Sequence, residues 1–125
     1  MVTSPPRRLR FPRSARVLRK ADFDRVYASR LHASDRLLTI NAAANGLDHA
    51  RLGLAVSRAV GPAVVRNRWK RRLREAFRRH PADWPAGFDF VVRPRGGTPP
   101  AFGEVVASLR RVTARVARQR GVAGT

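Results

Sequence analysis

Hydrophobic and polar positions divide the 125-residue chain into an aperiodic start and a series of short periodic segments. Residues 1–18 are rich in proline and arginine and follow neither the helical nor the strand period, so we expect a basic N-terminal arm. A single domain is predicted over residues 19–118, where the periodic segments lie, and a flexible tail over residues 119–125.

The first periodic segments predict one helix and two strands. Phe23, Val26 and Tyr27 follow helical spacing within residues 21–29. Residues 36–44 alternate between apolar and polar positions, which is typical of a strand. Asn45-Gly46 is a hairpin signal, so residues 51–57 are expected to be the return strand. One face of that strand carries only small residues, which leaves room for close approach by either the first helix or a ligand. These small residues are Gly53, Ala55 and Ser57.

A long amphipathic helix follows, then a third strand and a last helix. Gly61-Pro62 is expected to begin the long helix and His80-Pro81 to end it. The third strand is predicted over residues 88–92. The last helix is expected to begin at Pro99-Pro100, with Thr98 as its cap, and to run to about residue 117. The stripe predicted to pack on the sheet from the long helix comprises Val65, Trp69, Leu73, Ala76 and Phe77. The inward positions of the last helix are Phe102, Val105, Val106, Leu109, Val112 and Val116.

These segments give the order α-β-β-α-β-α and predict the α+β class, as a small sandwich with a three-stranded core sheet. The segment from the second strand through the long helix to the third strand is long enough for a parallel crossover. The general rule for such connections would make this crossover right-handed.

Charge points to a polyanionic partner. The chain has 27 Lys+Arg against 8 Asp+Glu, a net charge of +19, while 43% of its residues are hydrophobic. We expect a folded domain that binds nucleic acid, ahead of one that binds an anionic membrane surface. The acid-poor start has some likeness to a transit peptide, but an RNA-touching arm is the favoured interpretation. No apolar run is long enough to span a membrane, and no signal-peptide core follows Met1. Cysteine is absent, which excludes disulfides and thiol nucleophiles, so we expect a cytoplasmic protein.

The long helix concentrates this charge. Its exposed circumference is basic and carries a single acid, Glu75. Like charges recur one turn apart at Arg66, Lys70, Arg74 and Arg78, an arrangement that destabilises a helix unless phosphates relieve it. Asn67 lies among these cations, either as a tolerated surface residue or as an RNA contact.

Two aromatic residues leave an alternative open, and no catalytic set is found. Phe23 and Tyr27 either pack in the core or stack on single-stranded RNA. The three histidines lack metal-ligand spacing, the acids are scattered, and no glycine-rich phosphate loop is present. We therefore expect no catalytic centre in the protein, and the sequence assigns no metal site to it.

Four ordered blocks resemble one family. The run Val60-Gly61-Pro62-Ala63-Val64-Val65-Arg66-Asn67-Arg68-Trp69-Lys70-Arg71 is similar to the signature of the bacterial ribonuclease P protein subunit. Residues 16–27, 51–57 and 88–92 agree with the family in order and position. The resemblance covers residues 10–117.

This resemblance implies a fold and a role. The fold would be the α-β-β-α-β-α sandwich, of a kind also found in a ribosomal protein, with an unusual left-handed crossover. The chain would be the non-catalytic subunit of a ribonucleoprotein endoribonuclease that removes the 5′ leader from precursor tRNA. The partner RNA would be the catalyst and would use Mg²⁺. The partners implied are ribonuclease P RNA and precursor tRNA, with a monomeric protein in a one-to-one complex and no membrane.

The resemblance also implies two sets of site residues. Relatives commonly have a second basic residue where this chain has Ala59, and often an aromatic residue where it has Asn41. The residues expected to face the catalytic RNA are Arg58, Arg66, Asn67, Arg68, Arg71 and Arg72. The residues expected along the leader are Phe23, Tyr27, Thr39, Asn41, Lys70 and Arg74.

Three other functions remain as alternatives. A ribosomal-type protein that only braces RNA should be indifferent to the loss of Phe23 or Tyr27. A DNA-binding protein that uses the long helix should bind duplex DNA at least as tightly as RNA. A self-contained nuclease should cleave without an RNA partner.

Overall fold

The computed structural model describes residues 13–17 and 19–123. No helix in these ranges combines the length and the apolar character needed to cross a membrane. The main elements are α2 (Lys20–Ala28), β1 (Leu31–Ser34), β2 (Leu38–Ala44), β3 (Arg51–Leu54), α3 (Ala63–Arg79), β4 (Phe88–Pro94) and α4 (Phe102–Ala123). The described residues also form single-turn 3₁₀ helices at η1 (Arg13–Ala15), η2 (Arg58–Val60) and η3 (Pro81–Asp83).

The strands form one four-stranded sheet in the order β1-β2-β4-β3. The expected order α-β-β-α-β-α is confirmed for the core. The predicted sheet had three strands, however, and the observed sheet has four. The additional strand, β1, has only four residues, and two of them are the polar His32 and Ser34, so its hydrophobic pattern is weak. Its turn into β2 is formed by Asp35, whose Oδ1 accepts from the N–H groups of Leu37 (2.8 Å) and Leu38 (2.9 Å).

The predicted hairpin between residues 36–44 and 51–57 was wrong. Strand β4 lies between β2 and β3, antiparallel to β2 and parallel to β3. Asn45-Gly46 does turn the chain, but β3 does not pair with β2, because β4 lies between the two strands. The hairpin of the sheet is β1–β2. Strand β3 also ends at Leu54, although the N–H of Ala55 still donates to Val92 O at 3.0 Å.

The parallel crossover from β3 through α3 to β4 is left-handed, against the general rule and in line with the family resemblance. The side chain of Val92 faces the core that holds Trp69 and Leu73 of α3, and its carbonyl points toward β3, where it accepts from Ala55. Seen from the α3 side with β4 running upward, the chirality of an L-residue then puts β3 to the right of β4. A right-handed connection would have put it to the left.

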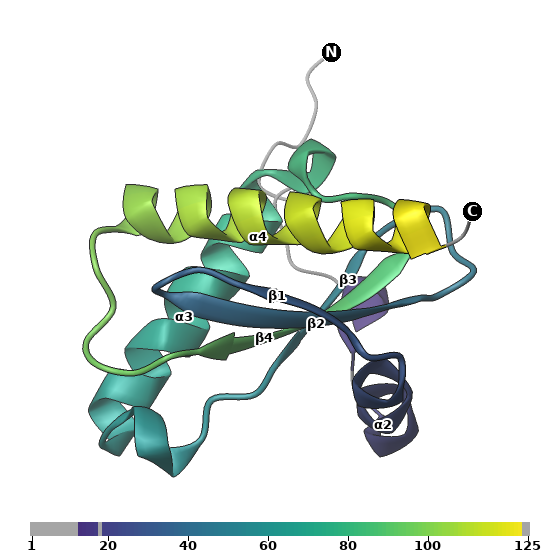
Figure 1. The fold of residues 1–125 in the computed structure, drawn as a ribbon. Coiled ribbons are helices and arrows are strands. Elements are labelled where there is room, and N and C mark those ends of the chain that lie inside the picture. The colour runs from purple at the N-terminus through teal and green to yellow at the C-terminus, as the bar shows by residue number, and fades with distance from the viewer. Residues whose placement is uncertain (1–12, 18, 124–125) are drawn as a thin grey trace.

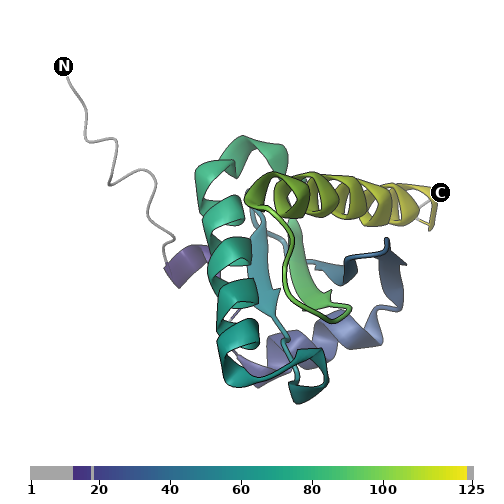
Figure 2. The ribbon, with the colours of Figure 1, turned by 90° about the vertical axis from the view of Figure 1, so that its left-hand side faces the viewer.

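Two layers of helix cover the sheet, one on each face (Figure 1). Helices α3 and α4 share the large core on one face, and α2 packs on the other, where Val26 meets Ala43 and Val91. Figure 2 shows α3 along one side of the sheet, and α4 running in a direction roughly perpendicular to α3. The predicted inward residues of both helices are confirmed, with Val65 and Phe102 at the partly buried edge of the core.

The observed ends of α3 agree with those predicted from sequence, whereas both ends of α4 differ from the prediction. Helix α3 begins directly after Pro62 and ends at Arg79, before His80-Pro81. Helix α4 begins at Phe102, so Thr98 is not its cap. Its first hydrogen bonds instead reach Ala101 O from the N–H groups of Glu104 and Val105. The helix continues to Ala123, into residues expected to be a tail.

Part of the expected arm is packed on the domain. Val17 is buried, and its N–H donates to Leu52 O at 3.0 Å. Arg16 forms an isolated parallel bridge with Leu52. Residues 1–12 and residue 18, the rest of that arm, lie outside the described part of the chain.

Candidate nucleic-acid interface

Helix α3 is fixed in its orientation by contacts with the loop that joins β4 to α4. The indole N–H of Trp69 donates to Gly97 O at 2.7 Å. Arg72, half-buried, donates through Nη1 to Pro100 O. Because Trp69 and Leu73 are also buried under the helix, the opposite side of α3 is held toward solvent.

The basic residues of α3 fall into two groups. Glu75, near the C-terminal end, accepts from Arg78 and Arg79, and the hydrogen bond from Arg78 is the main cause that lowers the pKa of Glu75. Among the described residues, no acid forms an ion pair with the other six bases of the helix. These are Arg66, Arg68, Lys70, Arg71, Arg72 and Arg74.

Three arginines of α4 differ, because each is held by an acid or a carbonyl of the protein. Arg110 pairs with Asp83 at 2.6 Å, and Arg111 pairs with Asp35 at 2.7 Å. Arg115 donates to Ser34 O at 2.6 Å. Among the described residues, α3 therefore carries six bases without an acidic partner, more than α4 does.

The residues expected to face the catalytic RNA lie on or next to this unpaired part of α3. Arg58 is exposed on η2, and Asn67, Arg68 and Arg71 are exposed on α3. Arg66 is half-buried, with its Nε donating to Gly61 O at 3.1 Å. A hollow of about 370 Å³ on the same helix is lined by Asn67, Lys70, Arg71, Arg74 and Glu75.

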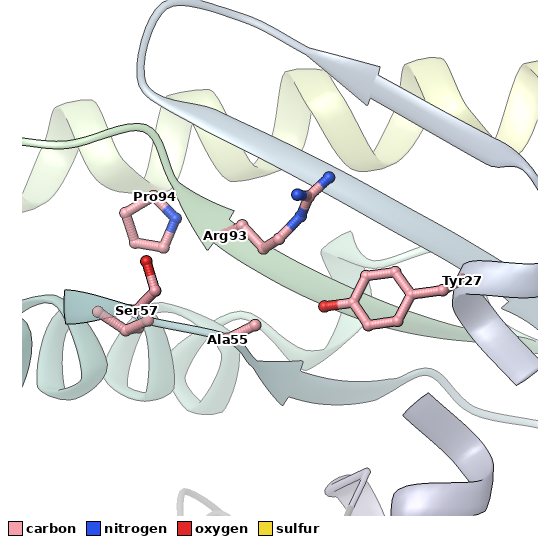
Figure 3. Close-up of a pocket in the computed structure, with 6 residues that line it drawn as sticks. Tyr27, Ala55, Ser57, Arg93 and Pro94 are labelled. Carbon is pink, nitrogen blue, oxygen red and sulfur yellow. The ribbon is translucent and has the colours of Figure 1, made fainter. Parts of the chain in front are cut away.

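A second candidate surface is a groove on the opposite face of the sheet, beside the end of α2 (Figure 3). It has a volume of about 480 Å³ and is lined by Tyr27, Ala55, Val56, Ser57, Arg93 and Pro94. Tyr27 is 40% exposed although it is a large aromatic residue. The small side chains of Ala55 and Ser57 keep this part of the sheet open.

Arg93 links the tyrosine to strand β2. Its Nη2 donates to Asn41 Oδ1 at 2.9 Å, and its guanidinium carbon lies 5.8 Å from the centre of the Tyr27 ring. Thr39 is the β2 partner of Arg93 in the register, so both side chains lie on this face of the sheet. Thr39 Oγ1 lies 2.9 Å from Ser34 Oγ. Asn41, which replaces an expected aromatic residue, therefore orients an arginine.

Phe23 and Tyr27 have different environments. The half-buried Phe23 packs against the cluster of Val26, Ala43 and Val91. Its Cζ lies only 3.0 Å from the place where a β-carbon on Gly53 would be. The small face of residues 53–57 thus serves both uses left open by the sequence: helix packing at Gly53, and open space at Ala55 and Ser57.

The residues expected along the leader lie on two separate surfaces in the structure. Tyr27, Asn41 and Thr39 gather around Arg93, whereas Lys70 and Arg74 line the hollow on α3 with Asn67. Sequence reasoning missed Arg93. The sequence feature that could have indicated Arg93 is its position two residues after Val91. Because side chains alternate along a strand, this position lies on the same face as Val91, which α2 covers only in part.

Within the described residues, no group of three or more His, Cys, Asp or Glu side chains could hold a metal ion. Together, the α3 surface and the groove offer phosphate-binding cations and an exposed aromatic ring. Both are features of proteins that bind RNA single strands.

Comparison with known proteins shows a match to one protein family. The family described as Ribonuclease P matches residues 11–117. A ribonuclease P protein component of Chromobacterium violaceum is 39% identical over 113 residues, covering 89% of this chain and 93% of the relative. One of Thermotoga maritima is 39% identical over 85 residues, covering 68% and 73%.

Solved structures agree with the sequence relatives. The RNase P protein of Thermotoga maritima superposes with a TM-score of 0.73 at 32% identity, covering 80% of this chain and 96% of that protein. The RNase P protein of Staphylococcus aureus gives a TM-score of 0.70 at 30% identity, covering 82% and 94%.

Proposed function

This chain belongs to the Ribonuclease P protein family, and we propose that its two candidate surfaces bind two different RNAs of one complex. As a ribonuclease P protein component, it is part of an endoribonuclease that acts in tRNA 5′ processing. The finer assignment, of the α3 surface to the catalytic RNA and of the groove to the 5′ leader of precursor tRNA, is our proposal.

The α3 surface suits a folded RNA. Its six bases lack acidic partners among the described residues, so phosphates would relieve their mutual repulsion. The contacts of Trp69 and Arg72 with the β4–α4 loop hold the surface rigid, which limits the entropy lost on binding. We include Lys70 and Arg74 in this surface, since they lie beside Asn67 and Arg71.

The groove suits a single strand. Tyr27 offers a ring on which a base can stack, and Arg93 beside it offers a charge for the next phosphate. Base pairing leaves no free base face for such a ring except at the end of a duplex, so this arrangement favours an unpaired leader. The exposed Tyr27 ring beside Arg93 is the observation that carries the assignment.

In this arrangement the protein contributes binding and electrostatics, and the partner RNA contributes the catalytic centre with its Mg²⁺. The protein would raise the affinity for precursor over mature tRNA, because only the precursor carries the leader. Its cations would also offset phosphate repulsion where the two RNAs meet. We propose a cytoplasmic, one-to-one ribonucleoprotein with a monomeric protein subunit.

Reconstitution tests this function. The protein is assembled with a bacterial ribonuclease P RNA in Mg²⁺, and the dissociation constants for precursor and mature tRNA are compared with and without protein. We expect the protein to tighten precursor binding much more than mature binding. An equal effect on both would remove the leader assignment, and cleavage by the protein alone would contradict the placement of catalysis in the RNA.

A further inference from the structure

A fully buried carboxylate joins three segments of the fold beneath α2. Asp89, near the start of β4, has no exposed side-chain surface. Its oxygens accept from Arg51 Nε (2.7 Å) and Nη2 (2.6 Å) on β3, and from Asn45 Nδ2 (3.0 Å) after β2. A further hydrogen bond comes from Arg25 Nη2 on α2.

Arg25 carries this network into helix α2. Its other terminal nitrogen, Nη1, donates to Ala44 O at 2.6 Å, at the end of β2. Asp22, one turn earlier on α2, lies 3.6 Å from Arg25 and 3.7 Å from Arg51. Two acids and two arginines therefore tie the helix to β3 and β4 at once.

The network is ionic at neutral pH. Burial by itself would raise the pKa of Asp89, but the hydrogen bonds from Arg51 and Asn45 and the charges of Arg51 and Arg25 lower it. Buried ion pairs contribute little net stability compared with well-packed apolar residues. What this one supplies is a defined position for α2.

That position bears on the groove. Ser29, on the other side of Tyr27 along the chain from Arg25, donates through Oγ to Ala42 O at 2.5 Å. Tyr27 thus lies between two points at which α2 is fastened to the sheet. Asp89 and Arg93 lie four residues apart on the same face of β4, about 13 Å along the strand. One strand therefore sets the place of both the helix and the arginine that faces its tyrosine.

We propose that Asp89 is a positioning residue for the leader, because it fixes α2 over the sheet and so fixes Tyr27 relative to Arg93. This inference rests on the proposed leader-binding function of the groove. Asp89 itself, being buried, touches no RNA.

The test compares three variants in the reconstituted complex. Asp89→Asn keeps the shape of the side chain and removes its charge. Arg25→Gln releases α2 from Asp89 while Arg51 and Asn45 stay bonded to it, so it remains informative if Asp89→Asn fails to fold. The matched control is Asp35→Asn, which removes a hydrogen-bonded carboxylate that joins the β1–β2 turn to Ser108 and Arg111 of α4.

The readout is the ratio of precursor to mature tRNA affinity, measured with enough protein to saturate the catalytic RNA. We expect Asp89→Asn and Arg25→Gln to lower this ratio about fivefold or more, the contribution of one stacked base. Affinity for mature tRNA and for the catalytic RNA should stay unchanged, as should the ratio in Asp35→Asn.

The outcomes separate the two claims. A wild-type ratio in both Asp89→Asn and Arg25→Gln, with a wild-type protein that prefers precursor, overturns the positioning role alone. An equal loss of the ratio in Asp35→Asn also overturns it, because general destabilisation would then account for the effect. A wild-type protein without any precursor preference overturns the leader assignment itself.

Discussion

Replacing Tyr27 with alanine should weaken the binding of precursor tRNA while leaving the fold nearly as stable as before. Tyr27 is 40% exposed and belongs to neither buried cluster, and the contact of its ring with Arg93 is a surface cation–π pair. Such pairs contribute about 0.5–1 kcal/mol at exposed sites. A base stacked on the ring contributes about 1–3 kcal/mol, so the loss in affinity should be roughly 5- to 150-fold.

The assay needs both tRNAs and one conservative control. Dissociation constants for precursor and mature tRNA are measured on the reconstituted complex, and the free energy of unfolding is measured by urea titration of the protein. Tyr27→Phe keeps the ring and should bind precursor within about twofold of wild type. Phe23→Ala is a poor probe of binding, because the half-buried Phe23 packs between α2 and the sheet. Its truncation would also cost stability, by less than the roughly 3–5 kcal/mol of a fully buried Phe.

Two results would refute the reasoning. If Tyr27→Ala weakens precursor and mature tRNA equally, the ring does not contact the leader. If Tyr27→Phe loses as much affinity as Tyr27→Ala, the hydroxyl and not stacking on the ring explains the contribution.

Three further predictions concern stability and charge. Hydrogen bonds from Ser108 and the backbone outweigh burial and hold the pKa of Asp35 at about 2, against an ordinary 3.8. Roughly 2 kcal/mol of stability should therefore be present above pH 4 and lost as the pH falls through about 2, and urea unfolding of Asp35→Asn should lack this loss. Gly53→Ala should cost about 1–3 kcal/mol in the same assay, because its β-carbon would lie 3.0 Å from Phe23 Cζ; a stability equal to wild type would contradict the close packing. Arg68→Ala and Arg71→Ala should each reduce the salt dependence of binding to the catalytic RNA by about one unit of log K against log[salt], whereas an unchanged slope would mean that the residue meets no phosphate.

The helices of this fold could be predicted from sequence because their signals are local and long. The stripe from Val65 to Phe77 repeats over more than three turns, and proline marks both ends of α3. Strand β1 escaped notice because four residues with two polar side chains give no clear alternation. The mistaken hairpin has another cause. Asn45-Gly46 describes only a local turn, and nothing in it shows that β4, more than forty residues later, will lie between β2 and β3.

The site was predictable to a similar extent. The bases of α3 follow from helical spacing and charge, which are local properties. The exposure of Tyr27 does not, because its spacing places it on one stripe with Phe23 and Val26. The grouping of Tyr27 with Arg93 and Asn41 depends on strand register, because β4 brings Arg93 beside β2. The role of Asp89 depends on three distant partners, and a single acid in the sequence gives no indication of them.

The central place of β4 in the sheet has a consequence for the synthesis of the chain. β4 is the last strand to leave the ribosome, and until residues 88–94 emerge, β2 and β3 have no common partner and expose unpaired backbone edges. The α3 helix is complete before then, but the sheet on which it packs is not. Assembly of the core is therefore expected to wait until β4 has been made and then to occur as one cooperative step. During that interval the arginine-rich segment is already available to RNA while the strand that holds Asp89 and Arg93 is still being made.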